Sequence, residues 1–210
     1  MALASPGVVR EEEIPADVEI NSPSVGILSK RFPGSGKCQI LDLGAPLAAN
    51  VEFFSIGSCR IHVEDLYRCL IAAENGVAHL DEEDDPPANR LARALSFDDR
   101  ARFDLVLAWD LLSYMQPPAI ELLMSRVARS CRAGALLFLA NSTSTTIPKV
   151  PARISMSRLG RMRYQNSLAE GTVANPRYSP IALEGMMPGF RLLHSFLLGE
   201  NIQEFLFSFA

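Results

Sequence analysis

Four acidic residues lie at the ends of short apolar runs, where their carboxylates could bind a ligand or accept a proton. They are Asp42, Glu64, Asp65 and Asp110. Open α/β sheets place their ligands at the carboxyl ends of the strands. These four residues are therefore the first candidates for a functional site.

Asp110 and Trp109 end the clearest buried strand of the sequence, and each has two interpretations. Asp110 could act as a general base or orient a nucleophile of the substrate. Alternatively, it caps the segment Leu111 to Ser113. Trp109 could stack on an adenine or a substrate ring, or it could simply belong to the core.

The elements that must position these residues follow from the hydrophobic pattern. Strands are predicted at residues 39–43, 60–63, 103–110 and 135–140, and helices at 24–32, 50–55, 66–75, 117–131 and 179–187. This alternation predicts an α/β fold with a doubly wound, mainly parallel sheet and right-handed crossovers. Two last strands, 190–198 and 202–209, are separated by a short turn and predict an antiparallel hairpin.

Between residues 38 and 210 this order of elements resembles the class I S-adenosylmethionine-dependent methyltransferase family. Three motifs carry the resemblance: Ile40-Leu41-Asp42-Leu43-Gly44, Val63-Glu64, and Phe103 to Asp110. The resemblance implies a Rossmann-like methyltransferase fold with a seven-stranded sheet that ends in a reversed hairpin. It also implies S-adenosylmethionine as the cofactor and methyl transfer as the activity.

The resemblance assigns roles to individual residues. The cofactor-binding candidates are Asp42, Gly44, Pro46, Glu64, Asp65 and Trp109, and the catalytic candidate is Asp110. Glu64 is a better candidate than Asp65 for binding the ribose hydroxyls, because it directly follows the alternating strand. The alternative for both acids is capping of the helix that begins at Leu66. Asp42 could instead hold the loop by accepting hydrogen bonds from its backbone N–H groups.

The glycine motif of the family is degenerate in this chain. Pro46 and Ala48 stand where the family has its second and third glycines. Proline fixes φ and removes an N–H donor, and alanine adds a methyl group where the backbone would approach the cofactor. The turn Arg132-Ala133-Gly134 also lacks the proline and second glycine of the family's motif.

Two functions are compatible with a chain that has the family's order of elements but departs from its glycine motifs. The first is a methyltransferase that acts on a small molecule or a protein. The second is a non-catalytic binding or scaffold protein, a pseudoenzyme that kept the sheet and lost the cofactor.

Composition sets broader limits on the protein. The 210 residues fit one domain and carry a net charge of −4, which does not favour nucleic acid as a partner. No apolar run is long enough to span a membrane, and no signal peptide is recognisable, so a cytoplasmic protein is expected. The four cysteines lack metal-type spacing and are expected to be reduced, mostly buried thiols, with no metal site.

We expect a flexible arm at residues 1–22 and a single domain at 23–210, with an irregular basic insertion at about 141–178. Between Lys149 and Arg177 this insertion has many basic residues and one acid. It could receive an acidic substrate, an RNA backbone or an acidic partner surface, or it could form local salt bridges with the loop Asp81 to Asp85. The final strand, if it lies near an edge of the sheet, could pair with a second copy of the chain to form a homodimer.

Overall fold

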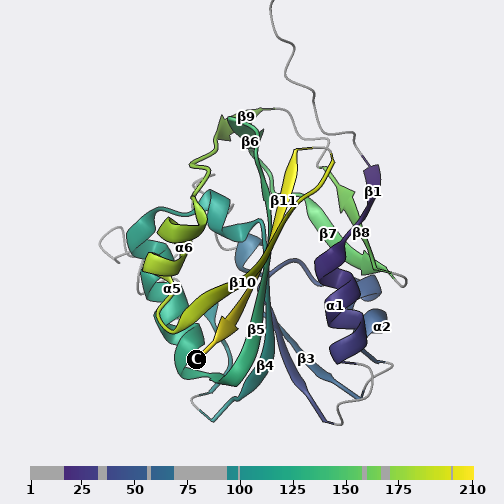
Figure 1. Cartoon of the computed structure of the whole chain (residues 1–210), viewed down its shortest axis with the longest axis vertical. Coiled ribbons are helices and arrows are strands. Elements are labelled where there is room, and N and C mark those ends of the chain that lie inside the picture. Colours follow the sequence, from purple (N-terminus) through teal and green to yellow (C-terminus); the bar gives the residue numbers. More distant parts are fainter. Residues whose placement is uncertain are drawn as a thin grey trace, which may run out of the picture.

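A computed structural model describes residues 17–32, 37–55, 58–68, 94–98, 100–157, 160–166, 171–199 and 201–210 of the chain. Its central feature is a twisted sheet with helices on both faces (Figure 1). None of the described helices is long and apolar enough to cross a membrane. The predicted α/β class with a mainly parallel sheet is confirmed.

The central sheet has the strand order β10-β11-β5-β4-β2-β3. The strands are β2 (Gln39–Asp42), β3 (Arg60–Val63), β4 (Phe103–Trp109), β5 (Cys131–Ser142), β10 (Phe190–Leu197) and β11 (Ile202–Phe209). Strand β2 pairs in parallel with β3 and β4, and β4 pairs in parallel with β5. Strand β11 is antiparallel to both β5 and β10.

Six strands are thus present in this sheet among the described residues, where seven were predicted. Residues 69–93, between β3 and β4, lie outside the described part of the chain. The final strand β11 lies inside the sheet, and β10 is at the edge. The final strand is thus the second from this edge, and the edge that a second copy of the chain could pair with here belongs to β10.

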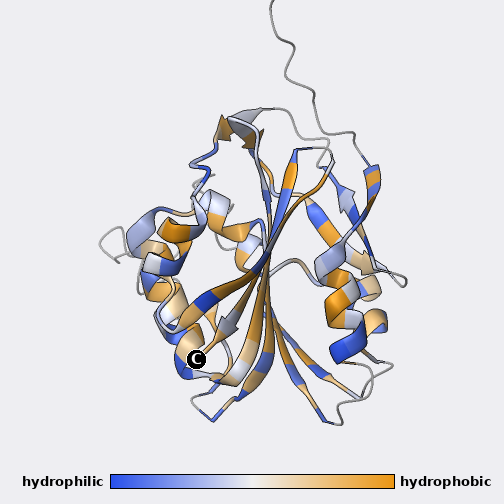
Figure 2. Ribbon diagram, in the orientation of Figure 1, coloured by the Kyte–Doolittle hydropathy of each residue, from blue (hydrophilic) through white to orange (hydrophobic). Residues whose placement is uncertain are grey.

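Helices cover the sheet on opposite faces, with α1 (Pro23–Arg31) and α2 (Ala48–Ser55) on one face and α5 (Pro117–Arg129) and α6 (Pro180–Met186) on the other (Figure 1). Four apolar side chains of α5 recur every three or four residues and are buried: Ile120, Leu123, Met124 and Val127. Such a stripe directs one face of a helix toward a core. Figure 2 shows the strongly apolar middle of the sheet between these helices.

Helix α5 ends at Arg129, and β5 begins at Cys131. The predicted turn at Arg132-Ala133-Gly134 is therefore wrong, because these residues already belong to the strand. Gly134 has φ 77°, and the pairing of β4 with β5 changes register in this part of the strand. Glycine adopts this left-handed conformation without steric cost.

The segment predicted to be irregular contains four strands: β6 (Thr146–Pro148), β7 (Arg153–Ser157), β8 (Arg161–Gln165) and β9 (Thr172–Ala174). Strands β7 and β8 form an antiparallel hairpin, and β1 (Asp17–Asn21) adds to β8 on its other side. Residues 17–21 are thus part of a sheet instead of a flexible arm. Residues 1–16 lie outside the described part of the chain.

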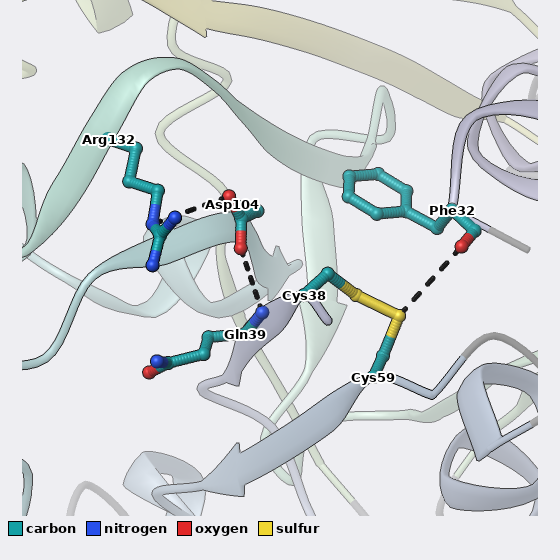
Figure 3. The surroundings of a disulfide bond; sticks show 6 residues. All are labelled: Phe32, Cys38, Gln39, Cys59, Asp104 and Arg132. Carbon is teal, nitrogen blue, oxygen red and sulfur yellow. Dashed lines mark hydrogen bonds and ion pairs between the residues drawn. A yellow bond between two sulfur atoms is a disulfide. The ribbon is translucent and has the colours of Figure 1, made fainter. Parts of the chain in front are cut away.

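Two of the cysteines are not reduced thiols. Cys38 and Cys59 form a disulfide, with their Cα atoms 4.5 Å apart (Figure 3). They immediately precede the register pair Gln39 and Arg60 on the neighbouring strands β2 and β3, so they lie side by side. Cys131 is free and buried, and burial raises the pKa of its thiol to about 12. The fourth cysteine, Cys69, lies outside the described residues.

Candidate functional site

The carboxyl ends of β2, β3 and β4 bring three of the predicted acids to one side of the sheet, here called the carboxyl edge. Backbone hydrogen bonds continue the ladder beyond these strands. The Leu43 N–H donates to the Leu107 carbonyl at 2.9 Å, and the Glu64 N–H donates to the Asp42 carbonyl at 2.8 Å. Asp42, Glu64 and Asp110 are therefore held by neighbouring strand ends, as the sequence predicts.

Asp42 is buried and holds the turn that follows β2. Its Oδ1 accepts hydrogen bonds from the Trp109 indole N–H at 2.6 Å and from the Gly44 N–H at 3.0 Å. Burial raises the pKa of Asp42 to about 6, although both hydrogen bonds act in the opposite direction. Asp42 thus supports the loop, as one of its two interpretations states.

Trp109 fills the space directly against Gly44. A Cβ built on Gly44 would lie 2.5 Å from Cδ1 and 2.7 Å from Nε1 of the indole. Trp109 has φ 49°, a left-handed conformation that is uncommon for a large residue, and its ring meets Phe138 edge-on at 5.7 Å between centroids. Trp109 therefore lies in the core, and Gly44 is required for its close approach. Pro46, another predicted cofactor-binding residue, is exposed.

The two acids that follow β3 have different partners. Glu64 is buried, and its carboxylate accepts hydrogen bonds from the Ser96 N–H at 3.0 Å and from the Ser96 hydroxyl at 2.8 Å. Asp65 accepts a hydrogen bond from the Arg68 N–H at 3.3 Å, in the helical turn at residues 66–68. Asp65 thus caps a helix, whereas Glu64 is a buried carboxylate at the carboxyl edge.

Asp110 is buried between two tyrosines. The Tyr67 hydroxyl donates to its Oδ1, and the Tyr164 hydroxyl donates to its Oδ2 at 3.2 Å. Burial raises the pKa of Asp110 to about 6, against the effect of these hydrogen bonds and of one from the Ala152 N–H. Its side chain makes no capping bond to the turn Leu111–Tyr114, so the capping interpretation is wrong.

The basic insertion closes over this edge through β7 and β8. Tyr164 comes from β8. On β7, the Met156 N–H donates to Asn50 Oδ1 at 2.9 Å, and Asn50 Nδ2 donates to the Ile154 carbonyl at 3.3 Å. Asn50 belongs to α2, the helix that follows the Gly44 turn. The β7–β8 hairpin is therefore joined both to Asp110 and to that helix.

Three side chains of this site were missed from the sequence: Tyr67, Ser96 and Tyr164. One signal for Tyr164 was available, because Arg161 to Gln165 alternates polar and apolar residues with the period of a strand. No comparable signal marks Ser96, whose contact with Glu64 depends on the tertiary fold.

Two arginines of the insertion, Arg161 and Arg163, have acidic partners in the same chain. Arg163 binds Asp17 through two hydrogen bonds of 2.9 and 2.5 Å, and Arg161 binds Glu19 at 3.0 Å. The alternative partner, the loop Asp81 to Asp85, lies outside the described residues. Within the described part of the chain, no group of three or more His, Cys, Asp or Glu side chains could hold a metal ion.

No protein-family model matches the sequence, and no curated protein matches it. Solved structures match over most of the chain. An S-adenosylmethionine-dependent methyltransferase from Mesorhizobium loti is 14% identical with a TM-score of 0.52, covering 89% of this chain and 96% of that one. A putative S-adenosylmethionine-dependent methyltransferase from Listeria monocytogenes is 11% identical with a TM-score of 0.50, covering 88% and 96%.

A third match was solved with ligands bound. The 1,6-didemethyltoxoflavin-N1-methyltransferase from Burkholderia thailandensis, with 1,6-didemethyltoxoflavin and S-adenosylhomocysteine, is 16% identical with a TM-score of 0.50. The match covers 90% of this chain and 77% of that one. At these identities the likeness concerns the fold. The chain has the fold of the class I S-adenosylmethionine-dependent methyltransferases.

Proposed function

We propose that the protein binds S-adenosylmethionine at the carboxyl edge and transfers its methyl group to a small-molecule or protein substrate. The observation that carries this proposal is the placement of Asp42, Glu64 and Asp110 at the ends of three neighbouring strands, with Gly44 shortly after the first of these ends. Neighbouring strand ends hold all three, and this is the side of an open α/β sheet where ligands bind.

The residues present fit the cofactor in part. Glu64 would accept hydrogen bonds from the ribose hydroxyls in exchange for those from Ser96, which it now holds at 2.8 and 3.0 Å. A cofactor could not approach the Gly44 turn directly, because the Trp109 indole already lies against it. Binding would require this indole to move. When bound, the cofactor would supply an electrophilic methyl group on a sulfonium.

The chain's own contribution to methyl transfer would be mainly positioning. Asp110 is the residue best placed to accept a proton from the substrate, because its carboxylate lies at the end of the central strand β4. Its pKa of about 6 is close to the range in which a general base works at neutral pH. Tyr67 and Tyr164 would orient it.

Calorimetric titration with S-adenosylmethionine and S-adenosylhomocysteine tests the proposal. We expect micromolar binding that Glu64→Gln weakens about tenfold, since a charge-assisted hydrogen bond contributes roughly 1.5–3 kcal/mol. Glu121→Gln, an exposed change on α5, is the matched control and should bind like the wild type. Absence of heat at millimolar ligand, in a folded protein, would contradict the proposal.

One observation favours a second candidate, a non-catalytic binding or scaffold protein. Trp109 lies against Gly44, and the Tyr164 hydroxyl donates to Asp110. Side chains of the chain itself therefore occupy positions at the carboxyl edge that a ligand would need. For this candidate we expect neither ligand to bind at millimolar concentration, in the wild type or in Trp109→Ala. Micromolar binding by the wild type would exclude it.

A further inference from the structure

The β7–β8 hairpin is attached to the carboxyl edge by polar contacts from both of its strands. Tyr164 of β8 donates to Asp110, and the backbone of β7 exchanges two hydrogen bonds with Asn50. The apolar side chains Ile154, Met156 and Met162 are also buried on this side. The hairpin therefore contributes to the burial of Asp110, and its movement would uncover the carboxylate oxygen that Tyr164 now contacts.

Strand β1 holds the hairpin from its outer side. It pairs with β8 over five residues, from Asp17 opposite Gln165 to Asn21 opposite Arg161. Its acidic side chains bind the arginines of β8, and the side chains of both ion pairs are 45% to 53% exposed. Exposed pairs contribute at most about 1 kcal/mol each and weaken with salt. The outer attachment is thus weak and depends on charge.

The residues that follow β1 are anchored to β11, and the Ser22 N–H also donates to the Gly160 carbonyl at 2.8 Å, directly before β8. The Ser22 hydroxyl donates to the buried carboxylate of Glu204 on β11, and the Ser24 N–H donates to the same carboxylate at 3.1 Å. Ser22 also caps α1 by accepting from the Val25 N–H. When β1 leaves β8, α1 can therefore keep its position, and the bond from Ser22 to Gly160 keeps the start of β8 attached there. Ser22 is thus the point about which β1 and the hairpin would turn.

We propose that β1 is a latch, a charged edge strand that keeps the β7–β8 hairpin closed over Asp110 and whose release opens the site. The part of the proposal that concerns regulation rests on the function proposed above. The latch itself can be tested without any ligand. Figure 1 shows β1 at the outer edge of β8, with the hairpin between β1 and the central sheet.

Hydrogen–deuterium exchange of β7 is the decisive measurement, because the backbone of β7 does not pair with β1. The Ser157 hydroxyl at the end of β7 does donate to Glu19 at 3.1 Å, so the amides of Ile154 to Met156 are the readout. We expect the double variant Asp17→Asn with Glu19→Gln to speed exchange of the β7 amides about two- to tenfold. In the wild type, added salt should have the same effect through screening, and in the variant it should have less. Exchange in β4 and β5 should stay unchanged, which would show that the variant remains folded.

A matched control removes two exposed carboxylates elsewhere, Asp98→Asn with Glu121→Gln, and should leave β7 exchange as in the wild type. If only β8 exchanges faster in the latch variant, or if neither strand responds to the substitutions or to salt, the latch is refuted. The salt series on the wild type decides the matter even if the variant unfolds.

S-adenosylhomocysteine separates this proposal from the proposed function. If the ligand needs the open edge, its affinity should rise in the latch variant by the same factor as β7 exchange, because the competent fraction of the protein rises. Faster β7 exchange without binding in any variant would support the latch and contradict the cofactor site. Equal affinity in the wild type and the latch variant would refute control of this site by β1.

Discussion

Trp109, Gly44 and Asp42 form one unit at the residue scale. The indole can donate to the buried Asp42 carboxylate only because Gly44 has no side chain in its path. The glycine that a cofactor loop would use for approach of a ligand is used here for approach of a tryptophan. The same carboxylate also accepts from the Gly44 N–H, so a change at any of the three residues affects the others.

Gly44→Ala should destabilise the protein by about 1–3 kcal/mol, the usual cost of forcing extra atoms into a packed site. The new Cβ would lie 2.5 Å from the indole, which would have to move away from Asp42. Urea unfolding measures the free energy of unfolding. Gly185→Ala in α6 is the control, since nothing lies within 4 Å of its Cβ position, and it should cost nothing. Equal stability of Gly44→Ala and the wild type would contradict the packing described.

Asp110 should make stability depend on pH. Burial raises its pKa in the folded protein to about 6 from an ordinary value of 3.8. The folded state then binds more protons than the unfolded state between these values, so the contribution of Asp110 to stability falls as pH rises through pH 4 to 6. Relative to Asp110→Asn, the wild type should lose about 3 kcal/mol over this window. Parallel pH profiles of the two proteins would show that Asp110 does not titrate in this way.

At the scale of elements, the strands and helices can be predicted from the hydrophobic pattern of each segment. The contacts between segments that are distant in sequence cannot. The run Phe103 to Asp110 is almost continuously apolar, and β4 occupies all but its last residue. By contrast, the contact of Cys38 with Cys59 arises only once β2 and β3 lie side by side in register. Cysteine spacing along the chain, 21 residues here, carries no such information.

The disulfide should stabilise the fold by about 3 kcal/mol, because it closes a loop of roughly 20 residues in the unfolded chain. Cys38→Ser with Cys59→Ser should lower the free energy of unfolding by this amount. A reductant should lower it in the wild type and leave the double variant unchanged. The bond joins the amino ends of β2 and β3, away from the carboxyl edge (Figure 3). Equal stability with and without reductant in the wild type would contradict this role.

At the scale of the whole molecule, the sequence predicts the parallel sheet and the location of the three acids at its carboxyl edge. The closure of the carboxyl edge could not be predicted. Tyr164 is 54 residues from Asp110 along the chain, and the pairing of β1 with β8 joins residues at least 140 positions apart. Contacts of this kind depend on how the insertion folds back over the sheet. Charge composition alone left an external acidic partner and local salt bridges both open, and it named Asp81 to Asp85, not β1, as the local partner.

The proposed binding of S-adenosylmethionine at the carboxyl edge requires Trp109 to move from Gly44. Trp109 is the only tryptophan among the 210 residues, so its fluorescence reports on this site alone. Titration of the wild type with S-adenosylhomocysteine should produce a saturable change in emission at micromolar ligand, and Glu64→Gln should shift the midpoint about tenfold higher, the factor that 1.4 kcal/mol represents. Emission that stays constant up to millimolar ligand, in a protein that remains folded, would contradict this proposal.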